Sequence, residues 1–148
     1  MKFSLALPRE ALSIPVIRRV LGEALRGLGV SEDCVADILV ATSEACTNVI
    51  QHARGASEFE VVGRVDDALC LLKIMDLGRG PRPTPSAADP AELAESGRGI
   101  RIMRALVDEL SIDSASERGT VVHLEKRLTW RDEALIRSLD DRLVHSAG

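Results

Sequence analysis

The stretch EACTNVIQHA, residues 44–53, places Glu44, Asn48 and His52 at intervals of four residues. In an α-helix this spacing brings the three polar side chains onto one face, within about 80° of each other. The opposite face is apolar and consists of Val35, Ile38, Leu39, Thr42, Ala45, Cys46, Val49, Ile50 and Ala53. The pattern predicts an amphipathic helix whose polar trio forms either a solvated surface or one wall of a site.

Outward from this helix, the apolar periodicity predicts an alternation of strands and helices. Strands are expected at residues 2–7, 58–65, 68–75, 110–115 and 119–127. Helices are expected from Ser13 to a C-cap at Gly29, from Ser31 to about Arg54, from Gly97–Gly99 to about Leu110, and at 131–144. The order β-α-α-β-β-α-β-β-α favours an α/β (α+β) two-layer sandwich, with a mostly antiparallel sheet and the helices on one face.

Composition places the chain among ordinary soluble domains, with 45% hydrophobic residues, 28% charged residues and a net charge of −4. The 148 residues fit one domain, 1–148, in which 128–148 form a C-terminal helical extension. The acidic balance and scarce aromatic residues argue against direct nucleic-acid binding. No apolar run is long enough for a membrane span, and a cytoplasmic location is expected. The cysteines, Cys34, Cys46 and Cys70, lie in apolar contexts typical of core thiols.

Two glycine motifs flank a region that is rich in proline and poor in bulky apolar residues, residues 79–96. The first motif is Asp76-x-Gly78-x-Gly80, directly after a buried strand. A carboxylate there can accept a hydrogen bond from an exocyclic amine, while the glycines allow a flat ring to approach the backbone. A simple turn after a strand explains the same residues.

The second motif is SGRGI, which comprises Ser96, Gly97, Arg98, Gly99 and Ile100. Two glycines at the mouth of a helix leave backbone N–H groups free for phosphate oxygens. An ordinary helix start is the alternative interpretation. The motif matches neither a P-loop nor the dinucleotide-binding G-x-G-x-x-G pattern.

Five features follow one another along the chain: the polar helix, the D-x-G-x-G turn, the proline-rich loop, the G-x-G motif and Gly119-Thr120. This series resembles the N, G1 and G2 boxes of the GHKL (histidine-kinase-like) ATPases. The resemblance covers roughly residues 3–127. The small size and the sequence TSEACTNVIQHA are most similar to the anti-sigma factor serine/threonine kinase branch. Membership implies a Bergerat-type ATP-binding fold, with ATP and Mg²⁺ as cofactors.

The resemblance also implies roles for individual residues. Asn48 would be the Mg²⁺ ligand, and Glu44 would accept the proton of an attacking hydroxyl. Asp76 would bind the adenine amino group with support from Thr120, and the proline-rich loop would act as a lid. His52 would be either a structural imidazole or a catalytic one. The nucleotide-binding set also includes Gly78, Gly80, Ser96, Gly97, Arg98, Gly99 and Ile100.

The implied function is an anti-sigma regulatory kinase. It would sequester a sigma factor and phosphorylate a serine or threonine of a small antagonist protein. The resemblance further implies a homodimer built around the first strand and helix. Two positions depart from the family pattern: Glu95 stands where some kinases of this branch carry a base, and Pro81 follows the second G1 glycine. A non-catalytic nucleotide-binding module that acts by partner exchange is the alternative.

Overall fold

The computed structural model describes residues 1–52, 57–76, 90–116 and 119–131, with the backbone alone for 90–96, 114–116 and 119. The elements are β1 (Lys2–Pro8), α1 (Ser13–Leu28), α2 (Glu32–His52), β2 (Glu58–Val65), β3 (Leu69–Asp76), α3 (Pro90–Leu106), β4 (Glu109–Ser116) and β5 (Gly119–Arg127). The expected order of strands and helices is confirmed up to β5. The helix expected at 131–144 and most of the proline-rich loop lie outside the described residues.

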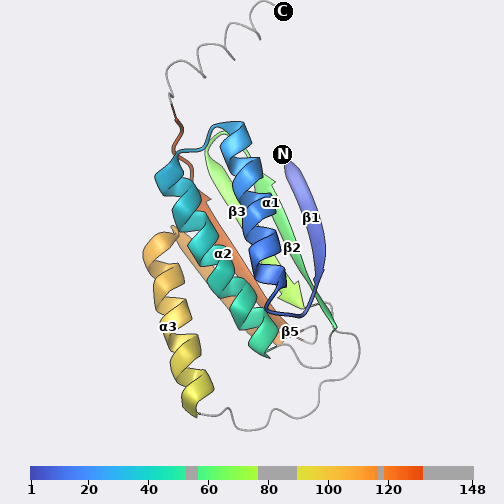
Figure 1. Cartoon of the computed structure of the whole chain (residues 1–148). Coiled ribbons are helices and arrows are strands. Elements are labelled where there is room, and N and C mark those ends of the chain that lie inside the picture. The colour runs from blue at the N-terminus through green and yellow to red at the C-terminus, as the bar shows by residue number, and fades with distance from the viewer. Residues whose placement is uncertain (53–56, 77–89, 117–118, 132–148) are drawn as a thin grey trace, which may run out of the picture.

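The strands form one sheet in the order β1-β2-β3-β5-β4, and each neighbouring pair is antiparallel. The last strand in the chain, β5, is therefore inserted between β3 and β4. Figure 1 shows the three helices on one face of this sheet, with α1 beside β1 and α2 across its middle. The mostly antiparallel two-layer sandwich expected from the sequence is confirmed.

The hydrophobic core lies between α2 and the face of the sheet that it covers. Alternate strand residues point into it, so that Phe59, Val61, Ile74 and Val122 are fully buried against the helices. The thiols of Cys34, Cys46 and Cys70 are buried too, which confirms their place in the core. Burial raises the pKa of Cys46 and of Cys70 to about 12, so both thiols stay protonated at neutral pH.

The capping residues expected at the ends of α1 and α2 are mostly confirmed. Gly29 adopts a left-handed conformation at the end of α1, with φ of 95°, which glycine tolerates without strain. The Ser31 hydroxyl accepts a hydrogen bond from the Cys34 N–H and so caps α2. Ser13 differs from expectation, because its hydroxyl donates to the Pro8 carbonyl, 2.6 Å away, and joins α1 to β1.

The start of α3 contradicts the sequence interpretation. The helix begins at Pro90 and ends at Leu106, so Gly97 and Gly99 lie inside it and not at its mouth. Residues 90–94, PAELA, explain the difference, because proline suits the first helical position and the next four residues favour helix. Together they offset the cost of two glycines, about 1 kcal/mol each. The helix also ends before Leu110, which belongs to β4.

None of the helices in the described part of the chain is long and apolar enough to span a lipid bilayer.

Candidate functional site

Three of the residues singled out in the sequence, Asn48, Asp76 and Thr120, lie near element ends that meet at one end of the molecule. In Figure 1 the C-terminal ends of α2 and β3 lie there together with the N-terminal ends of α3 and β5. Antiparallel pairing requires this for the two strands, because the end of β3 must face the beginning of β5. Four segments that are distant in sequence thus surround one region.

Asp76 and Thr120 occupy neighbouring strands at this end. The β3–β5 register pairs Met75 with Val121, and its extension by one residue places Asp76 opposite Thr120. Both side chains point toward the helical layer and are only 3% exposed. At this end of the sheet the Asp76 carboxylate can accept a hydrogen bond from a ligand, and the neighbouring Thr120 hydroxyl can donate one.

Asn48 provides the third buried polar group. It lies one turn before the end of α2 and is 8% exposed, although the sequence pattern assigned it to the polar face. Within the part of the chain that the structure describes, its side-chain amide makes no hydrogen bond to another side chain or to the backbone. Burial of an amide without a hydrogen-bond partner lowers the stability of the fold by about 1–3 kcal/mol. A ligand that supplies the missing partner would recover that energy.

Glu44, one turn earlier on α2, faces α3 directly. A Cβ atom built on Gly99 would lie 2.9 Å from the Glu44 Oε2 atom, so the glycine permits this close approach. The helices are packed so that the carboxylate rests against the α3 backbone. The structure therefore brings together Glu44 of the polar helix and Gly99 of the SGRGI motif.

The other candidates divide into three groups. Arg98 is exposed, Ile100 is half-buried against the core, and His52 is half-buried at the last residue of α2. Ser96 is described by its backbone alone, inside α3. Gly78 and Gly80 lie outside the described residues.

One positioning residue was missed by the sequence analysis. Lys126 of β5 donates to the carbonyl of Leu106, the last residue of α3, at 2.7 Å, and pairs with Asp37 of α2 at 3.4 Å. Its ammonium group therefore joins two helices to the sheet. No local pattern marks this lysine, because its partners are 20 and 89 residues away.

A metal at this site would need ligands beyond the residues that the structure describes. No group of three or more His, Cys, Asp or Glu side chains in the described segments could hold an ion. The buried Asn48 amide suits Mg²⁺, which commonly takes one or two protein oxygens and completes its shell with phosphates and water. The residues thus fit an ion that arrives with a phosphate ligand.

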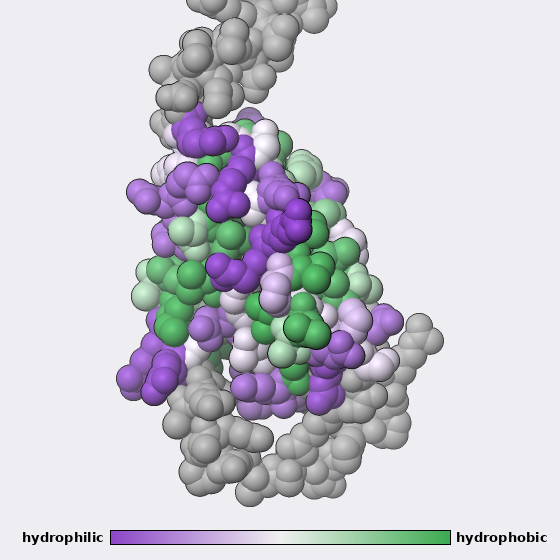
Figure 2. Space-filling view, viewed as in Figure 1, coloured by the Kyte–Doolittle hydropathy of each residue, from purple (hydrophilic) through white to green (hydrophobic). Residues whose placement is uncertain are grey.

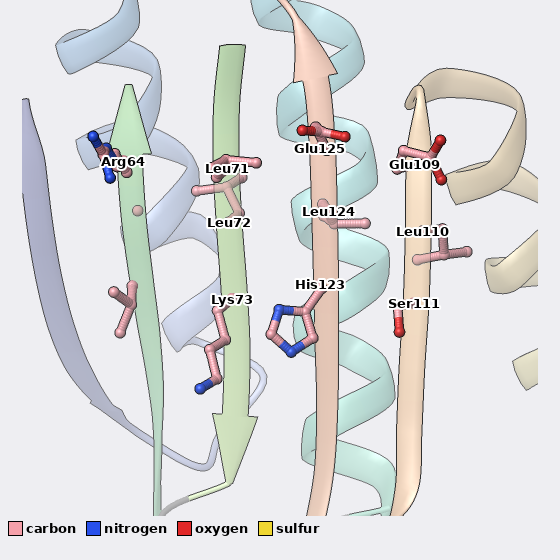
Figure 3. A pocket seen from close by; sticks show the side chains of 12 residues that line it. Arg64, Leu71, Leu72, Lys73, Glu109, Leu110, Ser111, His123, Leu124 and Glu125 are labelled. Atoms are coloured by element: carbon pink, nitrogen blue, oxygen red, sulfur yellow. The ribbon is translucent and has the colours of Figure 1, made fainter. Parts of the chain in front are cut away.

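A separate depression of about 390 Å³ lies on the opposite, outer face of the sheet. Figure 3 shows Arg64 and Lys73 on one side of it, and Glu125 and Glu109 on the other. It contains none of the candidate residues. The candidate site is therefore on the helix-covered side, at the end where α2, β3 and β5 meet.

Comparison with known proteins identifies the family. The profile of the histidine kinase-like ATPase domain matches residues 7–126, which includes Glu44, Asn48, Asp76, Gly99 and Thr120. The chain belongs to this family of ATPase domains. The resemblance to the GHKL superfamily is thereby confirmed.

Relatives of this ATPase domain include anti-sigma factors and protein kinases. It is 35% identical to the anti-sigma F factor of Bacillus licheniformis over 105 residues, covering 66% of this chain and 72% of the relative. It is 30% identical to the serine-protein kinase RsbW of Bacillus velezensis over 138 residues, covering 82% of each. Both relatives place the domain in an anti-sigma regulatory kinase family.

Solved structures agree on the fold. The ATPase domain superimposes on the structure of the RsbU and RsbW domains of a Mycobacterium tuberculosis protein with a TM-score of 0.67 and 22% identity. The match covers 88% of this chain and 34% of that protein, so this chain corresponds to about a third of its length. At this identity the likeness concerns the fold alone.

Proposed function

We propose that this ATPase domain is an anti-sigma regulatory kinase, which binds Mg-ATP and phosphorylates a serine or threonine of a small antagonist protein. The main support is the buried Asn48 amide, which lacks a partner in the described residues and lies one turn from Glu44. A metal-bound phosphate would supply that partner. Relatives named anti-sigma F factor and serine-protein kinase agree with this assignment.

Four polar side chains near the candidate site have a role in the proposed reaction, namely Asp76, Thr120, Asn48 and Glu44. Asp76 accepts a hydrogen bond from the adenine amino group, and Thr120 supports the ring beside it. The Asn48 oxygen would hold Mg²⁺, which would offset the negative charge of the ATP phosphates. Glu44 accepts the proton of the attacking hydroxyl as its oxygen bonds to the γ-phosphorus, while the bond from that phosphorus to the β–γ bridging oxygen breaks and ADP leaves.

The remaining motif residues complete the proposed pocket. Gly78 and Gly80 allow the backbone after Asp76 to approach the adenine ring. Residues 96–100 contact the phosphates in the proposed complex. Because Glu95 stands where some kinases of this branch carry a base, charge stabilisation of the terminal phosphate rests on Arg98 or Arg79.

The proposed partners are a sigma factor, which the domain sequesters, and the antagonist protein that it phosphorylates. We also propose a cytoplasmic location, one domain over residues 1–148 and a homodimer built around β1 and α1. Among the described strands, β1 pairs only with β2 and leaves one edge free. Beside it, α1 and the residue that precedes it expose an apolar stripe made of Leu12, Val16 and Val20.

The decisive experiment measures transfer of radiolabelled γ-phosphate from ATP to an antagonist identified by co-purification and mass spectrometry. Glu44→Ala should retain ATP binding but lose about 10²–10⁴-fold in transfer rate, or roughly 3–5 kcal/mol of barrier. Asn48→Ala should instead weaken Mg²⁺-dependent ATP binding. Asp33→Asn, an exposed acid at the other end of α2, serves as the matched control and should change neither quantity.

The alternative is a nucleotide-binding module that acts by partner exchange. It predicts tight Mg-ATP binding by the wild type, no phosphate transfer to any antagonist and no effect of Glu44→Ala. The departures at Glu95 and Pro81 are the observations that favour it. Failure of the wild type to bind ATP would contradict both functions.

A further inference from the structure

The position of the glycine motif inside α3 conflicts with its proposed contact to phosphate. Gly97 and Gly99 come seven and nine residues after Pro90, the first residue of the helix. Only the first four N–H groups of an α-helix are free, because each later N–H binds the carbonyl four residues before it. In this conformation the amides of residues 97–99 are occupied by the helix itself.

The helix also offers no packing reason for glycine at one of these positions. A Cβ atom on Gly97 would meet no atom of the described residues within 4 Å, so alanine would fit there and favour the helix. Gly99 differs, since its Cβ would lie 2.9 Å from the Glu44 carboxylate. The glycine at 97 therefore weakens the helix without any steric benefit in this state.

The other end of α3 is held by several contacts to the sheet. Lys126 binds the Leu106 carbonyl, and the Asp108 carboxylate accepts the Arg127 N–H at 2.6 Å. The Asp108 N–H in turn donates to the Glu125 carbonyl at 2.9 Å. A conformational change that preserves these contacts must be confined to the N-terminal part of the helix.

We infer that the N-terminal part of α3, residues 90–99, has two states, and that the helical state described here is the one that does not bind nucleotide. Unwinding of this part frees the amides of residues 97–99 for the phosphates, while the end at Leu106 stays fixed. Gly97 sets the balance between the two states. The inference rests on the proposed function and adds regulation of the same site by helix stability.

Two substitutions test the inference in opposite directions, with Mg-ATP affinity measured by calorimetry. Gly97→Ala should favour the helix and weaken binding about fivefold, equivalent to the roughly 1 kcal/mol by which alanine exceeds glycine. Ala94→Gly, within the first turns of α3, should disfavour the helix and tighten binding by a similar factor. Tighter binding by Ala94→Gly could not be due to a change in direct contacts, because the substitution only removes side-chain atoms.

Matched controls separate helix stability in general from the stability of α3. Gly27→Ala in α1 fills open space, and Ala36→Gly changes an exposed residue of α2. Both should shift the thermal midpoint and leave ATP affinity unchanged. If the wild type binds Mg-ATP but Ala94→Gly binds no more tightly, the two-state inference is wrong while the proposed function stands. If the wild type binds no ATP, the proposed function fails, and the inference fails with it.

Discussion

The buried polar residues of this domain differ in how their hydrogen bonds are satisfied. Thr42 donates its hydroxyl to the Ile38 carbonyl at 2.7 Å and needs nothing further. Asn48 is buried to a similar degree, yet it makes no hydrogen bond within the described residues. The first arrangement is typical of a helical core threonine. The second is typical of a group that is completed by a ligand.

At the residue scale, we expect Asp76→Asn to weaken ATP binding by about 1.5–3 kcal/mol, or roughly 10–150-fold. The reason is that the neutral amide forms a weaker hydrogen bond to the adenine amino group than the carboxylate does. Calorimetric titration with ATP, with and without Mg²⁺, measures the effect. Asp67→Asn, an exposed acid in the β2–β3 turn, is the control. Unchanged affinity in a folded Asp76→Asn variant would remove this carboxylate from the site.

Sequence patterns could identify most of these residues but not their surroundings. Asn48 and Glu44 follow from helical spacing, and Asp76 follows from its position at the end of an apolar strand. The burial of Asn48 was not predictable, because it depends on the layers packed around α2. The contacts of Lys126 depend on tertiary structure in the same way.

At the scale of single elements, the β2–β3 turn shows how one carboxylate fixes a strand register. The Asp66 carboxylate accepts hydrogen bonds from the N–H groups of Ala68 and Leu69, both at 2.8 Å. These two bonds lower the pKa of Asp66. The turn closes with the Asp66 N–H bonded to the Leu69 carbonyl, so the tight hairpin expected from Asp66-Asp67 is confirmed, centred on residues 67 and 68.

We expect Asp66→Ala to lower the thermal midpoint at neutral pH, because the variant loses both acceptor bonds. A carboxyl group with a lowered folded-state pKa stabilises the fold above its unfolded value, near 3.9, and loses that contribution as the pH falls through the folded value. The difference in thermal midpoint between the wild type and Asp66→Ala should therefore shrink below about pH 4. Thermal melts of both proteins from pH 7 to pH 2 test this. A difference that stays constant over this range would mean that the charge is not responsible.

The start of α3 shows where element prediction failed. The two glycines of SGRGI suggested a helix mouth, whereas the preceding PAELA segment is sufficient to begin a helix. Both signals are local and similar in strength. The residue at which α3 begins also depends on how α3 packs against α2, and this packing cannot be deduced from the sequence alone.

At the scale of the whole molecule, the sheet separates two unlike surfaces. Helices cover one face, while the other presents the charged side chains seen in Figure 3. Figure 2, viewed from the helical side, shows apolar patches among polar ones on the surface that includes α1. Leu12, Val16 and Val20 are 78%, 47% and 44% exposed, an unusual degree for a row of apolar residues spaced four apart.

If this row belongs to the proposed dimer interface, Val16→Glu and Val20→Glu should each weaken self-association at least tenfold. The reason is that a charge would be placed in the contact twice, once from each protomer. Light scattering after size-exclusion chromatography measures the mass. Leu71→Glu, on the outer sheet face and 39% exposed, is the matched control. Dissociation by Leu71→Glu instead would move the interface to the outer face, and a monomeric wild type would contradict the dimer.

The insertion of β5 between β3 and β4 has a consequence for the order of events during synthesis. The first three strands are neighbours in the order in which they leave the ribosome, so they can pair as they appear. In contrast, β4 emerges before β5, its partner in the sheet, and must wait for residues 119–127. Since Thr120 lies on that strand, the proposed binding site is assembled last. A nascent chain that ends before Gly119 should therefore form the β1–β3 meander but retain no affinity for ATP.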